Sequence, residues 1–267
     1  MELSNIKNSQ SSSEFIRDKM QVYVFSTRDE MGKRAAEDTA IKINELLLEK
    51  KELNIVFAAA PSQNEFLHYL SQNTSIQWNK INAFHMDEYI GLYKEAPQGF
   101  GNFLKEKIFN KVNFKTVNYI DGTATSIYEE CQRYENLLKK HPVDIVCLGI
   151  GENGHIAFND PPVANFNDKM LVKDVELDLS CRQQQVNENC FDTIKLVPKR
   201  AITLTIPALI SAEYLFCIVP SANKAKAVYN TIYNDINEKC PATILRRKEN
   251  TALYLDIESA KLIPTHT

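Results

Sequence analysis

The amino-acid sequence predicts an α/β fold: a doubly wound, mostly parallel sheet with helices on both faces, a three-layer arrangement of the Rossmann type. Short continuous apolar runs such as "DIVCLGI" (144–150) are typical of strands that are buried on both faces of a parallel sheet. Segments with helical spacing separate these runs, and no internal repeat or low-complexity linker interrupts them. Strand–helix alternation of this kind implies a parallel sheet covered by helices on both sides.

The predicted elements follow one another closely along the chain. The run "VYVF" (22–25) is a short strand, and Thr27 followed by Glu30 has the capping-box spacing that starts a helix ending near Lys51. Further strands are expected at 54–60, 81–84, 117–120, 144–150, 214–220 and 251–256. Further helices are expected at 64–70, 100–109, 127–138 and 221–238.

The domain organisation is simple. Residues 1 to about 20 are polar and rich in Ser and Asn, so we expect a flexible N-terminal arm. Residues 21–267 are expected to form a single α/β domain, because 44% of the 267 residues are hydrophobic and can supply a substantial core.

Composition excludes several classes of function. A formal net charge of −3 gives no basic excess for nucleic acid, and no apolar run approaches the roughly 20 residues that span a membrane. The N-terminus lacks the apolar core of a secretory signal, so we expect a cytoplasmic protein. The six cysteines show no paired spacing and the five histidines are scattered, which favours reduced thiols and no metal site.

One candidate segment is "GIGENGHIAFND" (149–160), directly after a predicted strand, where ligands of parallel sheets bind. Three of the eight glycines of the chain stand in its first six residues. Gly151 and Gly154 would let the backbone turn tightly and approach a ligand. His155 is suited to proton transfer near neutral pH, and Asp160 could orient it. The alternative is a structural turn with a histidine that caps a neighbour.

The same segment contains the spacing GxGxxG of dinucleotide sites, which is a weak motif alone. A dinucleotide site needs a helix at the last glycines, and Pro161 and Pro162 leave little room for one. We therefore expect no dinucleotide.

Three other segments after predicted strands carry reactive groups. In "FHMDEYIGL" (84–92), partial burial of Asp87 or Glu88 would raise the pKa of a carboxyl group toward that of a useful base. Lys224 in "PSANKAKAV" stands in the first turn of a predicted helix, an arrangement that can bind phosphate. Arg182 in "CRQQQ" could also bind phosphate. Taken alone, an acidic pair is more often a solvated turn and a lysine more often an ordinary surface residue, and the cluster around Arg182 could equally be a polar loop.

Together these segments resemble the glucosamine-6-phosphate deaminase/isomerase family. "FHMDEYIGL" is similar to the family pattern F-x-MDEY-x-GL, and "GIGENGHIAFND" is similar to G-x-G-x-[DN]-G-H-I-[AG]-F-N-E. "VPKRAITLTIPAL" (197–209), Lys224 and "CPATIL" (240–245) match later family segments in the same order. The resemblance runs from about residue 20 to 260 and implies the deaminase-like version of the predicted fold. Related 6-phosphogluconolactonases carry DER in place of DEY.

The resemblance implies an enzyme that converts an amino-sugar 6-phosphate to fructose 6-phosphate and ammonia without a cofactor. It implies that Asp87 is the base that moves a proton between C2 and C1, and that His155 opens the sugar ring. Asp160 falls where the family usually has a glutamate that supports this histidine, and Asn153 falls where several members have an aspartate. Lys224 matches the lysine that binds the substrate phosphate.

Two segments depart from the family. The first phosphate loop of the family is rich in glycine, whereas this chain has "AAAPSQNE" (58–65), in which Pro61 lacks an N–H donor and Glu65 adds negative charge. The remaining donors of this loop are Ser62, Gln63 and Asn64. The basic residues that bind an allosteric effector in hexameric members are not reproduced in "NDKMLVKDV" (167–175), so we expect no allosteric activation.

The family arginine that precedes the "VPK" segment has no clear match either. An ungapped placement puts Gln185 there. Arg182, Arg246 or Arg247 could take over this role.

The sequence therefore predicts a glucosamine-6-phosphate deaminase/isomerase that acts on a phosphosugar without a metal, and it leaves assembly into a homo-oligomer open. Three alternatives stay open: a deaminase that acts on galactosamine 6-phosphate, a 6-phosphogluconolactonase, and a non-catalytic module that senses sugar phosphates. The predicted catalytic residues are Asp87, His155, Asp160 and Asn153. The predicted substrate-binding residues are Ser62, Gln63, Asn64, Glu88, Gly151, Gly154, Arg182 and Lys224.

Overall fold

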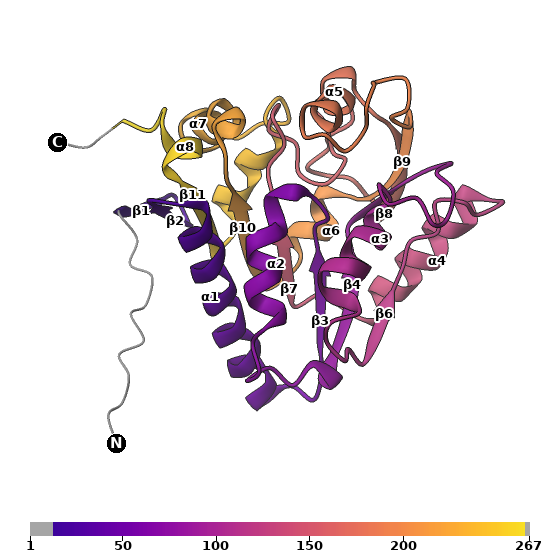
Figure 1. Cartoon of the computed structure of the whole chain (residues 1–267), viewed down its shortest axis with the longest axis horizontal. Helices are drawn as coiled ribbons and strands as arrows, with labels where there is room; N and C mark the ends of the chain where they lie inside the picture. Colours follow the sequence, from indigo (N-terminus) through magenta and orange to yellow (C-terminus); the bar gives the residue numbers. More distant parts are fainter. Residues whose placement is uncertain (1–12, 265–267) are drawn as a thin grey trace.

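The computed structural model of the chain describes residues 13–264. An eight-stranded sheet forms its centre, in the order β1-β2-β11-β10-β7-β3-β4-β6, and every neighbouring pair is parallel except β1 with β2 (Figure 1). Its strands are β1 Ser13–Arg17, β2 Met20–Phe25, β3 Leu53–Phe57, β4 Ile81–His85, β6 Thr116–Asn118, β7 Ile145–Leu148, β10 Tyr214–Val219 and β11 Thr251–Asp256. The predicted mostly parallel sheet is confirmed.

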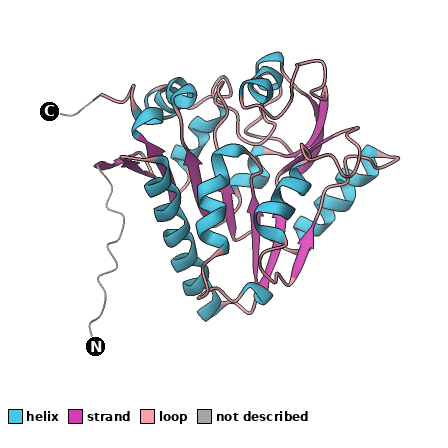
Figure 2. Cartoon of the chain, viewed as in Figure 1, coloured by secondary structure: helices cyan, strands magenta, loops and turns pink. Residues whose placement is uncertain are grey.

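Helices cover both faces of this sheet (Figure 2). The helices are α1 Arg28–Glu49, α2 Asn64–Ser71, α3 Phe100–Leu104, α4 Ile127–Lys140, α5 Leu179–Asn187, α6 Ile206–Ile210, α7 Ala225–Tyr233 and α8 Ile257–Ala260. Helices α1, α2 and α3 pack on one face, whereas α4, α6 and α7 pack on the other. None of the described helices is long and apolar enough to cross a membrane.

Strand β10 shows why the core has two halves. Leu215, Cys217 and Val219 face the layer of α4, α6 and α7, and the intervening Phe216 and Ile218 face the layer of α1 and α2. Because successive side chains of a strand alternate between faces, an uninterrupted apolar run serves both layers. The N-terminus of α1 is capped as the sequence predicted, since the Thr27 hydroxyl accepts a hydrogen bond from the Glu30 N–H at 3.1 Å.

A second sheet was not predicted. It is antiparallel, in the order β5-β9-β8, with β5 Asp87–Tyr89, β8 Val172–Glu176 and β9 Arg200–Leu204. Its strands are short and lie far apart in the sequence, so periodicity within a single window does not reveal their pairing. The sheet matters for function because it fixes the backbone of Asp87 against Thr203.

Two predicted boundaries are wrong. Within the expected arm, residues 13–17 form β1, because Phe15 pairs with Val22 and packs against the core; residues 1–12 lie outside the described part. The helix expected at 221–238 is a 3₁₀ turn at 222–224 followed by α7, which ends at Tyr233. Nη1 of Arg246 donates to the Thr231 and Asn234 carbonyls at this end and satisfies backbone acceptors there.

Candidate active site

A cavity lies where the carboxyl ends of β4, β3, β7 and β10 meet, as the rule for parallel sheets predicts. Asp87 follows β4, His155 follows β7 and Lys224 follows β10, and all three line this cavity. The other lining residues are Ala58, Ala59, Ala60, Ser62, Met86, Phe100, Gly149, Ile150, Gly151, Ala157, Phe158, Gln184 and Gln185. The cavity encloses about 60 Å³, well below the roughly 300–1,000 Å³ of typical small-ligand sites.

Asp87 is a buried carboxyl group with 6% of its surface exposed. Burial raises its pKa well above the ordinary value, and the neighbouring Glu88 carboxylate raises it further. Its backbone is held by His85, whose Nδ1 lies 2.9 Å from the Asp87 carbonyl oxygen and whose Nε2 accepts from the Ile120 N–H at 2.9 Å. Complete burial lowers the pKa of His85 to about 4, so this ring is neutral at neutral pH and serves as a structural support.

The His155 ring is oriented by two oxygen atoms. Its Nδ1 lies 2.8 Å from Oδ1 of Asn153 and 3.0 Å from Oδ1 of Asp160. Nδ2 of Asn153 donates to Oδ1 of Asp160 at 2.9 Å, which fixes the amide so that its oxygen faces His155. Because both neighbours of Nδ1 are acceptors, the neutral ring carries its proton there and leaves Nε2 free to accept one from a ligand.

Asp160 is fully buried beneath this ring. Burial acts to raise its pKa, but attraction to His155 and hydrogen bonds from His155, Asn153 and the Cys181 thiol together lower it below the ordinary value. Asp160 is therefore a stable carboxylate that can stabilise a protonated His155. Asn153 can orient the ring but cannot take the proton that an aspartate there could take.

Two glycines give the loop its shape. A Cβ atom at Gly151 would lie 2.1 Å from Cε1 and 2.3 Å from Nε2 of His155, so only glycine lets the imidazole lie against this backbone. Gly154 has a φ of +88°, and a Cβ there would lie 2.5 Å from Sγ of Cys240. Gly151 lines the cavity, whereas Gly154 shapes the turn without lining it.

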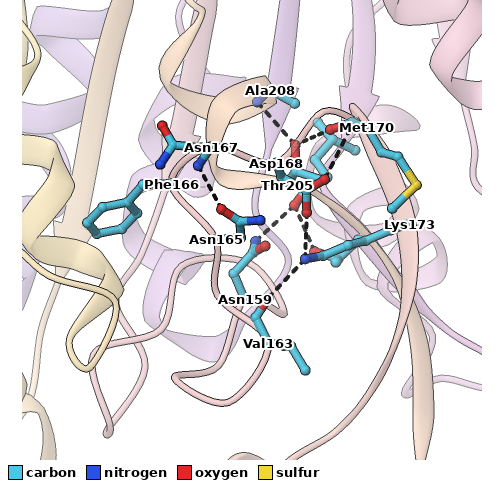
Figure 3. Close-up of polar contacts among 12 residues, drawn as sticks. Asn159, Val163, Asn165, Phe166, Asn167, Asp168, Met170, Lys173, Thr205 and Ala208 are labelled. Atoms are coloured by element: carbon cyan, nitrogen blue, oxygen red, sulfur yellow. Dashed lines mark hydrogen bonds and ion pairs between the residues drawn. The ribbon is translucent and has the colours of Figure 1, made fainter.

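Polar contacts among the labelled side chains fix the segment that follows this loop (Figure 3). Nζ of Lys173 donates to the Val163 carbonyl at 2.9 Å and to Oδ2 of Asp168 at 2.8 Å. Nδ2 of Asn159 donates to the Leu204 carbonyl at 2.9 Å and ties the segment to β9. Lys173 belongs to the stretch in which no effector-binding residues were expected, and its ammonium group has this internal structural role.

Lys224 is almost completely buried, with 4% of its side chain exposed, and stands at the N-terminal end of α7. Its Nζ lies 2.8 Å from Oε1 of Glu188, the residue that ends α5. Nε2 of Gln184 donates to the same oxygen at 2.9 Å. Lys224 therefore lines the cavity while its ammonium group is paired with the Glu188 carboxylate.

The loop 58–65 contributes less than expected. Ser62 lines the cavity, but the Gln63 amide is buried against the Ile218 carbonyl at 3.1 Å, and Asn64 lies outside the cavity. The negative charge of Glu65 is also directed elsewhere, since its Oε2 pairs with Nε of Arg28 at 2.7 Å.

Glu88 was predicted to bind the substrate, but its side chain does not line the cavity. Adjacent strand residues point to opposite faces, so Asp87 enters the cavity and Glu88 points away from it. The Glu88 carboxylate accepts the backbone N–H groups of Tyr89, Phe100 and Gly101 at 2.8 to 3.0 Å and caps the first turn of α3. It also borders a larger cavity of about 360 Å³ beside Lys94 and Lys105, which contains none of the predicted catalytic groups.

The predicted arginines do not enter the site. Nη2 of Arg182 donates to the carbonyls of Ile194 and Val197, and Nε of Arg246 pairs with Asp18 at 2.7 Å. Arg247 is exposed and does not line the cavity. Gln185, which the ungapped placement put at the arginine position, lines the cavity instead.

The sequence analysis missed Glu188 and Gln184. Gln184 lines the cavity and its Oε1 accepts from the Glu152 N–H at 2.8 Å. Gln184 belongs to the "CRQQQ" cluster, and its spacing of four residues from Glu188 places both on one face of a helix, a signal that could have linked Glu188 to that cluster.

One group of side chains has the composition of a metal site. His155, Asp160 and Cys181 bring a nitrogen, an oxygen and a sulfur within 4.8 Å of one another in the buried base of the site. These are ligand types that zinc accepts. All six cysteines are free thiols in the structure.

The comparison with known families decides the relationship. The model of the family of glucosamine-6-phosphate isomerases and 6-phosphogluconolactonase matches residues 26–254. The chain belongs to this family. A glucosamine-6-phosphate deaminase of Bacillus cereus (strain G9842) is 32% identical over 243 residues, which cover 91% of this chain and 89% of that protein. A glucosamine-6-phosphate deaminase of Listeria monocytogenes serotype 4b (strain CLIP80459) is 30% identical over 87% of this chain and 97% of its own.

Solved structures of a deaminase and of a lactonase resemble this chain. A monomeric glucosamine-6-phosphate deaminase aligns with a TM-score of 0.82 at 28% identity, over 90% of this chain and 99% of that one. A 6-phosphogluconolactonase from Thermotoga maritima aligns with a TM-score of 0.73 at 20% identity, over 89% and 99% of the two chains. The second similarity concerns the fold alone.

Proposed function

We propose that this family member is a glucosamine-6-phosphate deaminase that converts an amino-sugar 6-phosphate and water to fructose 6-phosphate and ammonia. The observation that carries the proposal is the meeting of Asp87, His155 and Lys224 in one cavity at the carboxyl ends of adjacent strands. The names and sequence identity of the Bacillus and Listeria relatives support the same activity.

His155 has the geometry for ring opening. With its proton on Nδ1, Nε2 takes the proton of the hydroxyl group on C1, and the resulting imidazolium returns a proton to the ring oxygen as the C1–O5 bond breaks. Asp160 stabilises the imidazolium through the 3.0 Å contact with Nδ1. Asn153 holds the ring in the required orientation.

Asp87 has the environment of a base for the next step. The carboxylate removes the proton from C2 of the open-chain aldose and delivers it to C1. A second proton passes from the amino group to O1, so that C1 becomes a CH2OH group and C2 becomes an imine. Addition of water to C2 then releases ammonia and forms the ketose. Burial raises the pKa of Asp87, and a base with a raised pKa holds the transferred proton better than an exposed carboxylate does.

Lys224 supplies the positive charge for the phosphate at the other end of the sugar. The Ser62 hydroxyl and the Gln185 amide line the same cavity and add neutral donors. Binding at this end orients C1 and C2 toward the two acid–base groups.

A substrate panel tests the proposal. The full chain is assayed with glucosamine 6-phosphate, galactosamine 6-phosphate and 6-phosphogluconolactone, and ammonia, ketose phosphate and acid release are followed separately. We expect ammonia and fructose 6-phosphate in equal amounts from the first substrate. Preference for the second identifies the C4 epimer as the substrate, and hydrolysis of the third without deamination contradicts the proposal.

Matched variants separate chemistry from folding. Asp87→Asn is expected to lower kcat at least about 10³-fold, because an amide cannot accept the proton. Asp235→Asn removes the same charge at an exposed position and should retain the wild-type rate. Turnover by a folded Asp87→Asn protein would assign the base to another residue.

Cytoplasmic location and assembly into a homo-oligomer stay predictions.

A further inference from the structure

The end of the cavity around Lys224 carries an anion of the protein itself. The 2.8 Å contact joins Nζ of Lys224 to Oε1 of Glu188, and the two side chains are only 4% and 13% exposed. At this depth water screens the pair weakly, so the attraction is far stronger than in a surface ion pair.

Glu188 is held in this position by its own helix. Its backbone N–H bonds to the carbonyls of Gln184 and Val186 and ends α5, while Nε2 of Gln184 donates to Oε1. Gln184 also accepts the Glu152 N–H, and Oε1 of Glu152 accepts from Nδ2 of Asn223 beside Lys224. This network connects α5 to the loop before His155 and to the turn before α7.

Neither Gln185 nor Arg182 offsets the negative charge of the Glu188 carboxylate in the cavity. Gln185 stands in the cavity without charge, and the Arg182 guanidinium is bonded to carbonyls outside it. Lys224 and Glu188 together have no net charge, so an incoming phosphate dianion meets a carboxylate on the cation that should bind it. The cavity encloses only about 60 Å³, and Gln184 and Gln185 of α5 are among its lining residues.

We propose that Glu188 is an internal counter-ion that competes with the substrate phosphate for Lys224 and thereby sets the affinity of the site for phosphorylated sugars. The inference rests on the proposed function, in which Lys224 contacts the phosphate. Substrate binding exchanges one anion for another at the same ammonium group, and Glu188 moves away with the end of α5. Glu188 is a specificity residue: it disfavours weakly held anions and admits a ligand that the rest of the cavity also holds.

The test removes the charge of Glu188 and measures anion binding without turnover. Inorganic phosphate and glucosamine 6-phosphate are titrated calorimetrically into wild type, Glu188→Gln and Glu176→Gln. Glu176 is an exposed glutamate on β8, so its variant controls for the change in net charge. We expect Kd for both ligands to fall about tenfold in Glu188→Gln, a conservative figure for a close buried charge pair, and to stay unchanged in Glu176→Gln.

Kinetics give a second readout that a purely structural role would not produce. KM for glucosamine 6-phosphate should fall with Kd while kcat stays within about twofold, because Glu188 is remote from the reacting carbons. The affinity for unphosphorylated glucosamine should not change. Equal or weaker phosphate binding by Glu188→Gln, or tighter binding of both sugars alike, would overturn the inference.

A second variant covers the case in which a buried, unpaired Lys224 prevents folding of Glu188→Gln. Glu188→Asp keeps the charge and withdraws it by one methylene group, so it should tighten phosphate binding by a smaller factor. The outcomes also separate the two proposals. Tighter phosphate binding without any deamination would reject the proposed function alone, and deamination with unchanged Kd and KM in both variants would reject the counter-ion alone.

Discussion

At the scale of single residues, the contact between Gly151 and His155 explains why glycine gathers in 149–154. The imidazole lies against the Gly151 backbone where any Cβ atom would overlap three ring atoms, at 2.1 to 2.4 Å. Asn153 and Asp160 then hold Nδ1 from the other side. The imidazole is therefore held by close packing against the Gly151 backbone on one side and by the polar contacts of Nδ1 on the other.

Replacing Gly151 by alanine should therefore remove activity without unfolding the protein. We expect kcat for deamination to fall at least about 100-fold, because the displaced ring no longer aligns with the substrate. Gly91→Ala is the control: its φ of +87° makes alanine cost about 1 kcal/mol of stability, but no atom lies within 4 Å of the added Cβ. Deamination assays and thermal unfolding of both variants check this, and a fully active Gly151→Ala protein would show that the ring is not fixed this way.

Asp87 links catalysis to stability. Its folded-state pKa is raised, so burial of the charged form destabilises the protein, and this loss grows as the pH rises through the folded pKa. Asp87→Asn should be more stable than wild type at pH 8, and the difference should vanish below the pKa of an unfolded aspartate. Urea unfolding at pH 3 to 8 measures it. A variant that is less stable at pH 8 would contradict the burial of an unpaired carboxylate.

At the scale of elements, the turn between β4 and β5 depends on a neutral histidine. Both ring nitrogens of His85 bond to backbone groups of residues 87 and 120. The backbone N–H of His85 donates to the Tyr134 hydroxyl at 3.0 Å. This turn carries the chain from the parallel sheet to the antiparallel one. The position of Asp87 therefore depends on an uncharged ring beneath it.

Acid should unfold the protein partly through His85. Its pKa is lowered from 6.5 to about 4, so its contribution is present above pH 6.5 and is lost as the pH falls toward 4. The difference corresponds to about 3 kcal/mol. His85→Gln is expected to be less stable at pH 7 but to lose less stability than wild type between pH 6.5 and 4. Parallel denaturant titrations decide it, and equal acid slopes would show that His85 is not responsible.

At the scale of the whole molecule, the sequence pattern predicted the elements whose formation depends on neighbouring residues in the chain, namely buried strands and amphipathic helices. Apolar runs such as 144–150 are buried on both faces, and the segment 127–138 is helical because Cys131, Tyr134 and Leu138 share one face. The rule that ligands bind beyond parallel strands then placed Asp87, His155 and Lys224 at one edge. The sequence could predict the main sheet and these three residues because each follows its own strand.

The rest depends on contacts between distant segments. The pairing of β5 with β9 joins residues more than 100 positions apart, and the ion pair of Glu188 with Lys224 depends on how α5 lies over the cavity. Neither leaves a periodic signal. Arg182 was predicted to bind phosphate because its charge is visible in the sequence, whereas the carbonyls that hold it come from a loop whose course is not.

In the proposed complex, a carboxylate, an imidazole and an ammonium group surround one phosphorylated hexose. A crystal structure of the chain with the open-chain 2-amino-hexitol 6-phosphate, a non-reacting substrate analogue, tests it most directly. We predict C2 beside the Asp87 carboxylate, the C1 end at Nε2 of His155, and the phosphate on Nζ of Lys224 with Glu188 displaced. An analogue bound in the larger cavity beside Glu88 and Lys94, with Lys224 still paired to Glu188, would contradict the account.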